Sequence, residues 1–172
     1  MDNLINEIKK LSEHDFPNDA VYDLLEGSCL SKKEIQDYIL FNPDKYTRHL
    51  IYKDSSFELL LMCWSPGQKA PVHGHEGEKC FMRVEEGSLQ FTNYSLESTK
   101  PLTLIMKDST KGDPGFLDGP ADLHSVENIF PYNAVTFHVY AKPYGECDVY
   151  DIEAGNIYRK KLVYDTMFKK PC

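Results

Sequence analysis

Two histidines separated by one residue are the feature of this sequence most suited to chemistry. His73 and His75 lie in the stretch PVHGHEGEKCF, residues 71–81. On a β-strand alternate side chains project from the same face, so the two residues would lie about 6 to 7 Å apart along the backbone. Neutral imidazole nitrogen binds zinc, copper, iron and nickel, and both rings could reach one such ion. The pair alone is also consistent with two surface histidines in a polar turn, so a metal site needs a third ligand.

The residues around this pair follow the spacing of a known metal-binding motif. The sequence resembles the first motif of the cupin superfamily. The spacing of that motif is matched by Gly67, His73, His75, position 80 and Gly87. That motif normally has glutamate at position 80, whereas this chain has Cys80. The resemblance implies a β-barrel in which His73 and His75 are metal ligands.

A third histidine occurs where the second cupin motif is expected. In GPADLHSVEN, residues 119–128, Asn128 follows His124 at the fourth position, as in that motif. Upstream the stretch departs from the usual pattern, because Gly119 and Ala121 stand in place of the expected proline and glycine. The order of the two motifs still predicts a barrel that brings His124 beside the histidine pair.

The cysteine at position 80 changes the expected charge of the site. Three neutral imidazoles without a carboxylate leave a divalent metal ion with its full positive charge. That charge favours an anionic ligand, and a thiol bound to iron(II) loses its proton. The missing glutamate therefore indicates a thiol substrate, although three imidazoles also suit zinc or nickel.

Residues from about 40 to about 155 resemble the cysteine dioxygenase family, non-haem iron enzymes that convert cysteine and O2 to cysteine sulfinate. The matching segments are YTR (46–48), CW (63–64), HGH with CF (73–81), LHSVEN (123–128) and TFHVY (136–140). The resemblance implies an Fe(2+) centre held by His73, His75 and His124. It further implies that L-cysteine binds iron through its thiolate and amine, which leaves one position for O2. The reaction would then belong to cysteine catabolism and taurine biosynthesis.

By the same resemblance, Arg48 holds the carboxylate of the substrate, with Tyr46 beside it. A guanidinium group offers a planar fork that can bind a carboxylate through two hydrogen bonds. Outside this family context, Arg48 would be interpreted as a surface arginine that forms a salt bridge.

The resemblance also assigns roles to the strand that carries Tyr140. Cys80 and Tyr140 occupy positions that animal members join by a thioether bond, a protein-derived cofactor. His138 is expected to orient Tyr140, and alternation along the strand places Thr136 on the same face as both. Otherwise Cys80 is a buried thiol and Tyr140 a core aromatic residue. Cys147 matches a cysteine near the mouth of the family's site, or is a spare strand thiol.

Two other functions are compatible with these residues. A related dioxygenase acts on 3-mercaptopropionate or another small thiol, but glutamine is typical at its carboxylate-binding position, so Arg48 favours cysteine. A non-catalytic cupin that binds a metal ion or a ligand belongs to a different class. It would need an accessory domain or another ligand surface, and the remaining sequence contains no DNA-binding helix pair or basic patch.

The elements that must position these residues change character near residue 43. Before it, three short amphipathic helices are expected over 3–11, over 17–27 and from Ser31 onward, the last with a capping box to Glu34. After it, runs rich in β-branched and aromatic residues predict at least seven strands. The expected strands cover 57–64, 79–84, 88–94, 102–106, 134–140, 148–152 and 160–164, and 111–120 is expected to be a loop.

The predicted fold is therefore mainly β, a cupin-type barrel or jelly roll with a short N-terminal helical segment packed outside. We expect a single domain over residues 1–172, with helices at 1–42 and the barrel at 43–172. This length suffices for one full hydrophobic core.

The composition excludes several classes of protein. The 172 residues carry a net charge of −8, which argues against a general grip on nucleic acid, since neutralising phosphates needs a basic surface. The N-terminus lacks the apolar run of a signal peptide, and no long apolar segment predicts a membrane span. Five scattered cysteines suit a reducing compartment. We expect a cytoplasmic protein whose partners are L-cysteine and O2, with no obligate protein partner.

Overall fold

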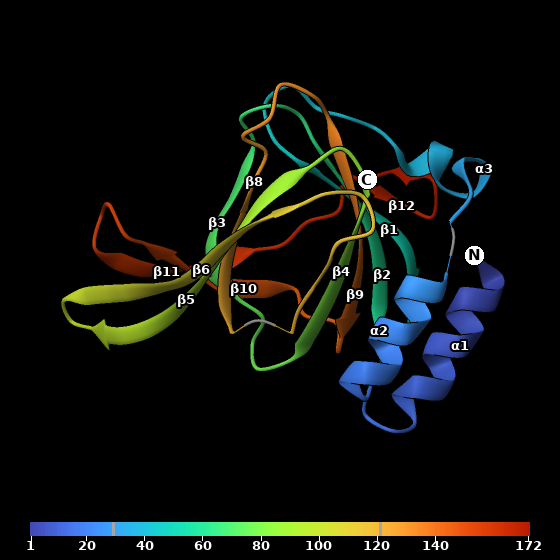
Figure 1. Cartoon of the computed structure of the whole chain (residues 1–172), viewed down its shortest axis with the longest axis horizontal. Helices are drawn as coiled ribbons and strands as arrows, with labels where there is room; N and C mark the ends of the chain where they lie inside the picture. The colour runs from blue at the N-terminus through green and yellow to red at the C-terminus, as the bar shows by residue number, and fades with distance from the viewer. Residues whose placement is uncertain (29, 121) are drawn as a thin grey trace.

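A computed structural model of the protein describes residues 1–28, 30–120 and 122–172. Cys29, one of the five cysteines, and Ala121, from the second motif, lie outside the described residues. Within these ranges the molecule is mainly β, with two sheets that form a barrel and helices packed against one side of it (Figure 1). The cupin-type fold predicted from the sequence is confirmed.

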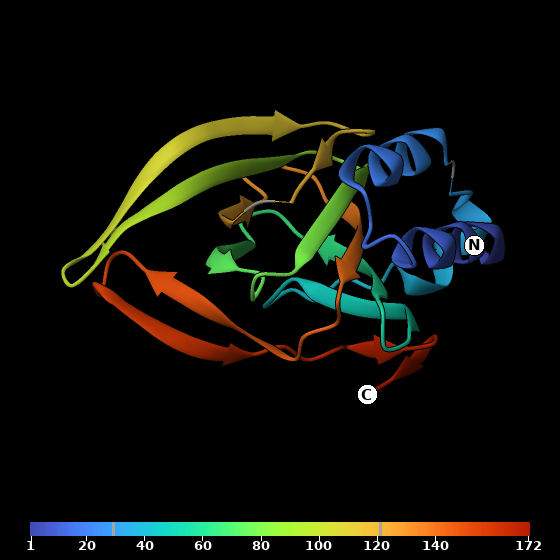
Figure 2. The same cartoon turned by 90° about the horizontal axis from the view of Figure 1, so that it is seen from below.

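The helices cover the outer face of one sheet, at the end of the molecule away from the long hairpins (Figure 2). They are α1 (Asp2–Ser12), α2 (Asn18–Gly27), the short α3 (Lys32–Ile35) and the 3-10 helix η1 (Gln36–Tyr38). The predicted capping box is present, and the Ser31 amide and hydroxyl both donate to Glu34 Oε2, at 2.9 and 2.6 Å. Ile8, Val21 and Leu25 are fully buried against the sheet.

Among the residues described, seven strands form one sheet and six form the other. Their orders are β13-β12-β1-β2-β9-β4-β7 and β11-β10-β3-β8-β5-β6. The strands of the first sheet are β1 (Thr47–Lys53), β2 (Glu58–Trp64), β4 (Lys79–Glu86), β7 (Leu117–Asp118), β9 (Ala134–Ala141), β12 (Thr166–Met167) and β13 (Lys170–Pro171). Those of the second are β3 (Lys69–Gly74), β5 (Leu89–Thr99), β6 (Leu102–Gly112), β8 (Leu123–Glu127), β10 (Glu146–Asp151) and β11 (Asn156–Lys161).

The central strand β2 is buried along its whole length. One of its faces packs against the helices and the other against the barrel interior, so both faces are apolar rather than alternately apolar and polar. The residues facing the helices are Leu59, Leu61 and Cys63, and those facing the interior are Leu60, Met62 and Trp64. The helices therefore explain why this strand is a continuous apolar run, as they do in sheets covered on both sides.

Helix α2 is tied to the barrel by a buried arginine. Arg83 on β4 is 5% exposed. It donates hydrogen bonds to the backbone carbonyls of Leu25 and Ser28 at the end of α2 and to the Ser28 hydroxyl, and its Nε lies 2.7 Å from Glu85 Oε1. These bonds satisfy carbonyl groups that a helix leaves without partners at its C-terminus.

Two hairpins extend away from the helices (Figure 2). The hairpin β5–β6 is longer than the sequence indicated, because β6 continues to Gly112 into the expected loop. Most of β6 is exposed and polar, so it lacks the apolar alternation of a half-buried strand and depends on its pairing with β5. The hairpin β10–β11 likewise places β11 at Asn156–Lys161 rather than at 160–164.

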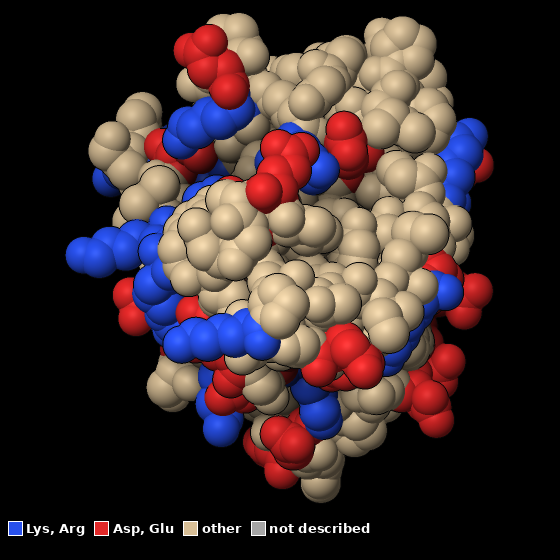
Figure 3. Space-filling model, turned by 90° about the vertical axis from the view of Figure 1, so that its left-hand side faces the viewer, with Lys and Arg blue, Asp and Glu red and all other residues tan. Residues whose placement is uncertain are grey.

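The face at the hairpin end carries mixed charges. Figure 3 shows lysine, arginine, aspartate and glutamate side chains interspersed around a hollow of uncharged residues. This face therefore presents no continuous basic surface of the kind that binds nucleic acid. No helix in the described ranges is long and apolar enough to span a bilayer.

Candidate metal centre

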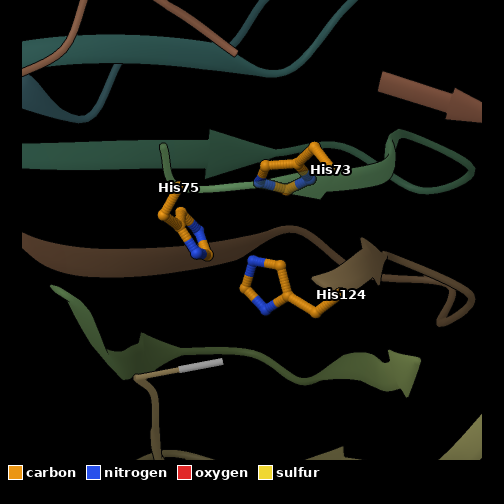
Figure 4. A group of neighbouring side chains, drawn as sticks. All are labelled: His73, His75 and His124. Atoms are coloured by element: carbon orange, nitrogen blue, oxygen red, sulfur yellow. The ribbon is translucent and has the colours of Figure 1, made fainter. Parts of the chain in front are cut away.

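Strand pairing brings the three predicted histidines together. His73 on β3 lies directly opposite His124 on β8, and His75 follows the end of β3 at Gly74. The ring centroids of His73 and His75 are 5.3 Å apart, and each lies 4.8 Å from that of His124. Their ligand nitrogens all lie within 4.8 Å of one another, and the rings face a common space (Figure 4).

Neighbouring acceptors fix the orientation of two of the rings. His73 Nδ1 is 2.8 Å from the carbonyl oxygen of Pro71, so this nitrogen carries the proton and Nε2 keeps its lone pair. His124 Nδ1 lies 3.3 Å from Oδ2 of Asp118 on β7. Burial, together with the adjacent His124 and His75, lowers the pKa of His73 well below its ordinary value. The neutral imidazole favoured here is the form that binds a metal ion.

No carboxylate joins the three histidines among the residues that the structure describes. The position of the usual glutamate is occupied by Cys80 on β4, which lies opposite Tyr140 on β9. Three converging imidazoles, two of them held through Nδ1, form a donor set that fits a divalent transition metal with positions left for other ligands.

His73 and His124 line a small cavity inside the barrel, with a volume of about 30 Å³. Arg48, Cys80, Tyr140 and Cys147 also line it. Its other lining residues are Tyr46, Met62, Trp64, Ala70, Pro71, Val126, His138, Tyr144, Val149, Lys160 and Leu162. Its lining is mainly apolar and includes one guanidinium group, a combination typical of sites that bind small molecules.

Arg48 is buried, at 7% exposure, and therefore is not the surface arginine that its sequence context alone would suggest. Its Cζ lies 5.6 Å from the ring centroid of Tyr140 and 6.0 Å from that of Tyr164. Its backbone is fixed by Asp165, because Arg48 N donates to Asp165 Oδ2 at 2.9 Å and Asp165 N donates to the Arg48 carbonyl at 2.8 Å. The neighbouring Tyr46 stacks on Trp64 with ring centroids 4.6 Å apart.

The strand β9 brings Thr136, His138 and Tyr140 to the same side of the sheet. The Trp64 indole donates to Thr136 Oγ1 at 2.9 Å, and Thr136 Oγ1 is 2.8 Å from His138 Nε2. The rings of His138 and Tyr140 are stacked, with centroids 5.7 Å apart and planes 6° apart. His138 was expected to orient Tyr140, and in this structure its contact with the tyrosine is ring stacking.

Cys80 and Tyr140 are adjacent, buried groups. Burial raises the pKa of the Cys80 thiol, and a hydrogen bond with Tyr140 offsets only part of this shift. Burial likewise raises the pKa of Tyr140 well above its usual value. Both groups are therefore protonated at neutral pH, and the Tyr140 hydroxyl remains a hydrogen-bond donor. Cys147 is buried in the same cavity, at 2% exposure.

Comparison with known proteins decides the family. The model of the family described as cysteine dioxygenase type I matches residues 2–153. The chain belongs to this family. Human cysteine dioxygenase type 1 is 25% identical over 155 residues, which cover 87% of this chain and 78% of the human protein. The zebrafish (Danio rerio) protein of the same name is 24% identical over 172 residues, covering 95% of this chain and 85% of its own length.

A solved structure supports the fold of this family member. The chain is similar to TT1209 from Thermus thermophilus, with a TM-score of 0.52 and 22% identity, over 63% of this chain and 95% of that one. At this identity the likeness shows the fold alone. Family membership makes the protein a cupin-type thiol dioxygenase, an oxidoreductase that uses O2, and the three histidines form its candidate metal site.

Several residues of the site were missed by the sequence analysis. Asp118, which bonds to His124, comes from a strand of two residues, and Tyr144 comes from the turn after β9. Glu58 and Tyr164 lie behind Arg48. Tyr164 lies beyond residue 153, where the match to the cysteine dioxygenase family model ends. Of these residues, only Glu58 could have been noticed in the sequence, because it is a charged residue at the start of the apolar run 58–64.

Proposed function

We propose that this protein converts L-cysteine and O2 to cysteine sulfinate, with Fe(2+) as its metal. The observation that carries the proposal is the buried guanidinium of Arg48 on the wall of the same small cavity as His73 and His124. A cavity with a metal site and a buried guanidinium group matches a small thiol that also bears a carboxylate. Iron(II) bound to the three histidines would supply the electronic route by which both atoms of O2 add to the substrate sulfur.

The side chains around the metal site hold the substrate. Arg48 binds the carboxylate, and its fixed position orients the thiol towards the histidines, as proximity catalysis requires. The stack of Tyr46 on Trp64 forms part of the apolar wall that excludes water. The Tyr140 hydroxyl donates a hydrogen bond into the cavity, and His138 and Thr136 support it from behind.

The experiment that tests this function compares two thiols. Arg48→Ala should raise the KM for L-cysteine at least about thirtyfold, as expected when a desolvated charge pair loses one member. The KM for cysteamine, which lacks a carboxylate, should change far less. A faster reaction of the unmodified protein with cysteamine or 3-mercaptopropionate than with cysteine would overturn the assignment. Mass spectrometry after reaction under 18O2 should find two labelled oxygen atoms in the sulfinate.

A thioether between Cys80 and Tyr140 is part of this proposal. Its support is their direct pairing across β4 and β9 and the hydrogen bond between the two groups. Joining the sulfur to the ring removes one hydrogen atom from each, so O2 must accept two electrons and two protons. A denaturing gel should show two bands that merge into one in Cys80→Ala, and a single unchanged band in the unmodified protein would exclude the bond.

The compartment also belongs to the proposal. The four cysteines that the structure describes, Cys63, Cys80, Cys147 and Cys172, are free thiols. Free thiols fit the reducing cytoplasm expected from the sequence.

A further inference from the structure

A buried carboxylate lies behind Arg48. Glu58, the first residue of β2, is 1% exposed and pairs with Tyr140 of β9. Its Oε2 accepts a hydrogen bond of 2.5 Å from the Tyr164 hydroxyl and lies 3.0 Å from Lys53 Nζ. Its Oε1 lies 3.9 Å from Nη2 of Arg48. Glu58 thus has a cation on each side, one lining the cavity and one towards the surface.

Lys53 is the outer member of this group. Its ammonium donates to the Tyr164 hydroxyl at 2.8 Å and lies 5.3 Å from the centroid of that ring, while its side chain is 37% exposed. Burial works to lower the pKa of Lys53, but its hydrogen bonds to Tyr164 and Glu58 outweigh burial and raise the pKa above its ordinary value. Lys53 therefore stays charged at neutral pH.

The geometry leaves Arg48 available for another anion. A separation of 3.9 Å is an ionic contact and is too long for a hydrogen bond, so Glu58 does not occupy the donors of the guanidinium. Within the described part of the chain, Arg48 Nε and Glu58 Oε1 have no hydrogen-bond partner. Buried donors without partners are unfavourable unless a ligand satisfies them.

The charges of the group explain what that ligand would be. Arg48 and Lys53 contribute two positive charges, Glu58 contributes one negative charge, and Tyr164 is neutral. One positive charge remains, and it faces the cavity because Lys53 already neutralises Glu58 from outside. Without Lys53 the buried Arg48 and Glu58 would balance each other, and a substrate carboxylate would have to compete with Glu58 for the guanidinium.

We propose that Lys53, acting through Glu58, determines how tightly the cavity binds a carboxylate-bearing substrate. Neither residue lines the cavity, so both are positioning residues that set the charge available on Arg48. This inference rests on the proposed function, in which Arg48 binds the carboxylate of a small thiol. Glu58 competes for Arg48, and Lys53 relieves that competition.

The test measures binding as well as turnover in the full-length, iron-loaded protein. In Lys53→Met the Kd for L-cysteine, titrated without O2, should rise on the order of tenfold, and KM should rise with it. The Kd for cysteamine should change less than about twofold, since it has no carboxylate. Lys53→Arg should retain cysteine binding. Lys10→Met, which removes the same charge from an exposed ion pair on α1, is the matched control.

A double variant separates this role from a merely structural one. In Lys53→Met with Glu58→Gln, the competing carboxylate is gone, so the affinity for cysteine should return towards that of the unmodified protein. Equal weakening of cysteine and cysteamine in Lys53→Met, or no rescue by Glu58→Gln, would overturn the inference. If Arg48→Ala itself leaves cysteine binding unchanged, the proposed function has failed instead.

Discussion

Two imidazoles of the candidate metal site are held through Nδ1 by neighbouring residues. His73 is held by a backbone carbonyl of its own strand, at Pro71. His124 depends instead on the side chain of Asp118, which is 12% exposed and comes from another sheet. An acceptor on Nδ1 fixes the tautomer and raises the basicity of the nitrogen that binds the metal. Of these two ligands, His124 is therefore the one more open to change through a neighbouring side chain.

Replacing Asp118 should weaken metal binding without removing a ligand. In Asp118→Ala, His124 loses its Nδ1 acceptor, so we expect the affinity for Fe(2+) to fall about 10- to 100-fold. Competition with a chelator of known affinity measures the change. Asp108→Ala removes an exposed aspartate that bonds to Asn93 and serves as the control. Equal metal affinity in the Asp118 and Asp108 variants would show that Asp118 does not support the ligand.

At the scale of single residues, the sequence identified candidate site residues that belong to a recognisable motif. The spacing of His73 and His75 and the later His124 predicted three side chains that the structure brings together, because strand pairing places these positions around one point. Asp118 and Glu58 escaped prediction because each acts through a partner that no local pattern identifies. Glu58 is 106 residues from Tyr164, and nothing in the sequence near either residue reports such a contact.

At the scale of elements, apolar strands were predicted well and polar ones were not. β2 and β9 are buried throughout. β2 is a continuous apolar run and β9 is rich in β-branched and aromatic residues, so their sequences identify them as strands. β3 carries the first predicted ligand but contains Pro71 and Gly74, which usually mark turns. β8 likewise carries His124 in a short, mixed segment. The strands that hold the metal ligands are thus the ones whose sequences are least strand-like.

The turn after β7 should tolerate no side chain at Gly119. Its φ of +106° is one that residues other than glycine rarely adopt, and an added Cβ would lie 1.9 Å from the Cys80 carbonyl oxygen. Gly119→Ala should therefore displace β7 and with it Asp118, which lowers both the melting temperature and the affinity for metal. Gly155→Ala, at a positive φ in open space, strains only the backbone and is the control. Equal losses of melting temperature and metal affinity in Gly119→Ala and Gly155→Ala would exclude the clash with the Cys80 carbonyl.

The link between α2 and the barrel should contribute to stability rather than to activity. Arg83→Met leaves the last carbonyls of α2 and the carboxylate of Glu85 without their partner, so we expect a loss of about 2 to 4 kcal/mol in the free energy of unfolding. Urea denaturation measures it, and KM for cysteine should stay unchanged in the folded fraction. Arg159→Met, which removes a half-exposed arginine paired with three acidic residues, should destabilise far less. A larger loss in Arg159→Met would contradict the assignment.

At the scale of the whole molecule, distant segments meet on β1. The C-terminal strand β12 pairs parallel with β1, and Asp165 bonds to the backbone of Arg48. His49, 1% exposed, connects three segments: its Nδ1 is 2.9 Å from Thr166 Oγ1, and its Nε2 is 3.0 Å from the Leu40 carbonyl and 2.8 Å from Thr47 Oγ1. The end of the chain is thus anchored next to the residue proposed to bind substrate.

This anchoring should make stability depend on pH. Burial lowers the pKa of His49 below the ordinary value of 6.5, and the carbonyl of Leu40 offsets only part of the shift. Between the two pKa values the unfolded chain binds more protons than the folded one, so stability falls as the pH drops below about 6.5. The contribution of His49 to this loss of stability levels off once the pH is below the lowered pKa of His49 in the folded state.

The measurement is urea denaturation of the unmodified protein and of His49→Gln between about pH 5 and 8. Because burial lowers the pKa of His73 and His138 as well, the contribution of His49 is the difference between the two pH profiles. Glutamine retains hydrogen bonding but does not titrate, so the variant should lose less stability on acidification, although it is less stable at pH 8. If the free energy of unfolding changes with pH equally in the unmodified protein and in His49→Gln, His49 has the same pKa in the folded and unfolded chains. The junction of β1 with the C-terminal segment would then not respond to pH.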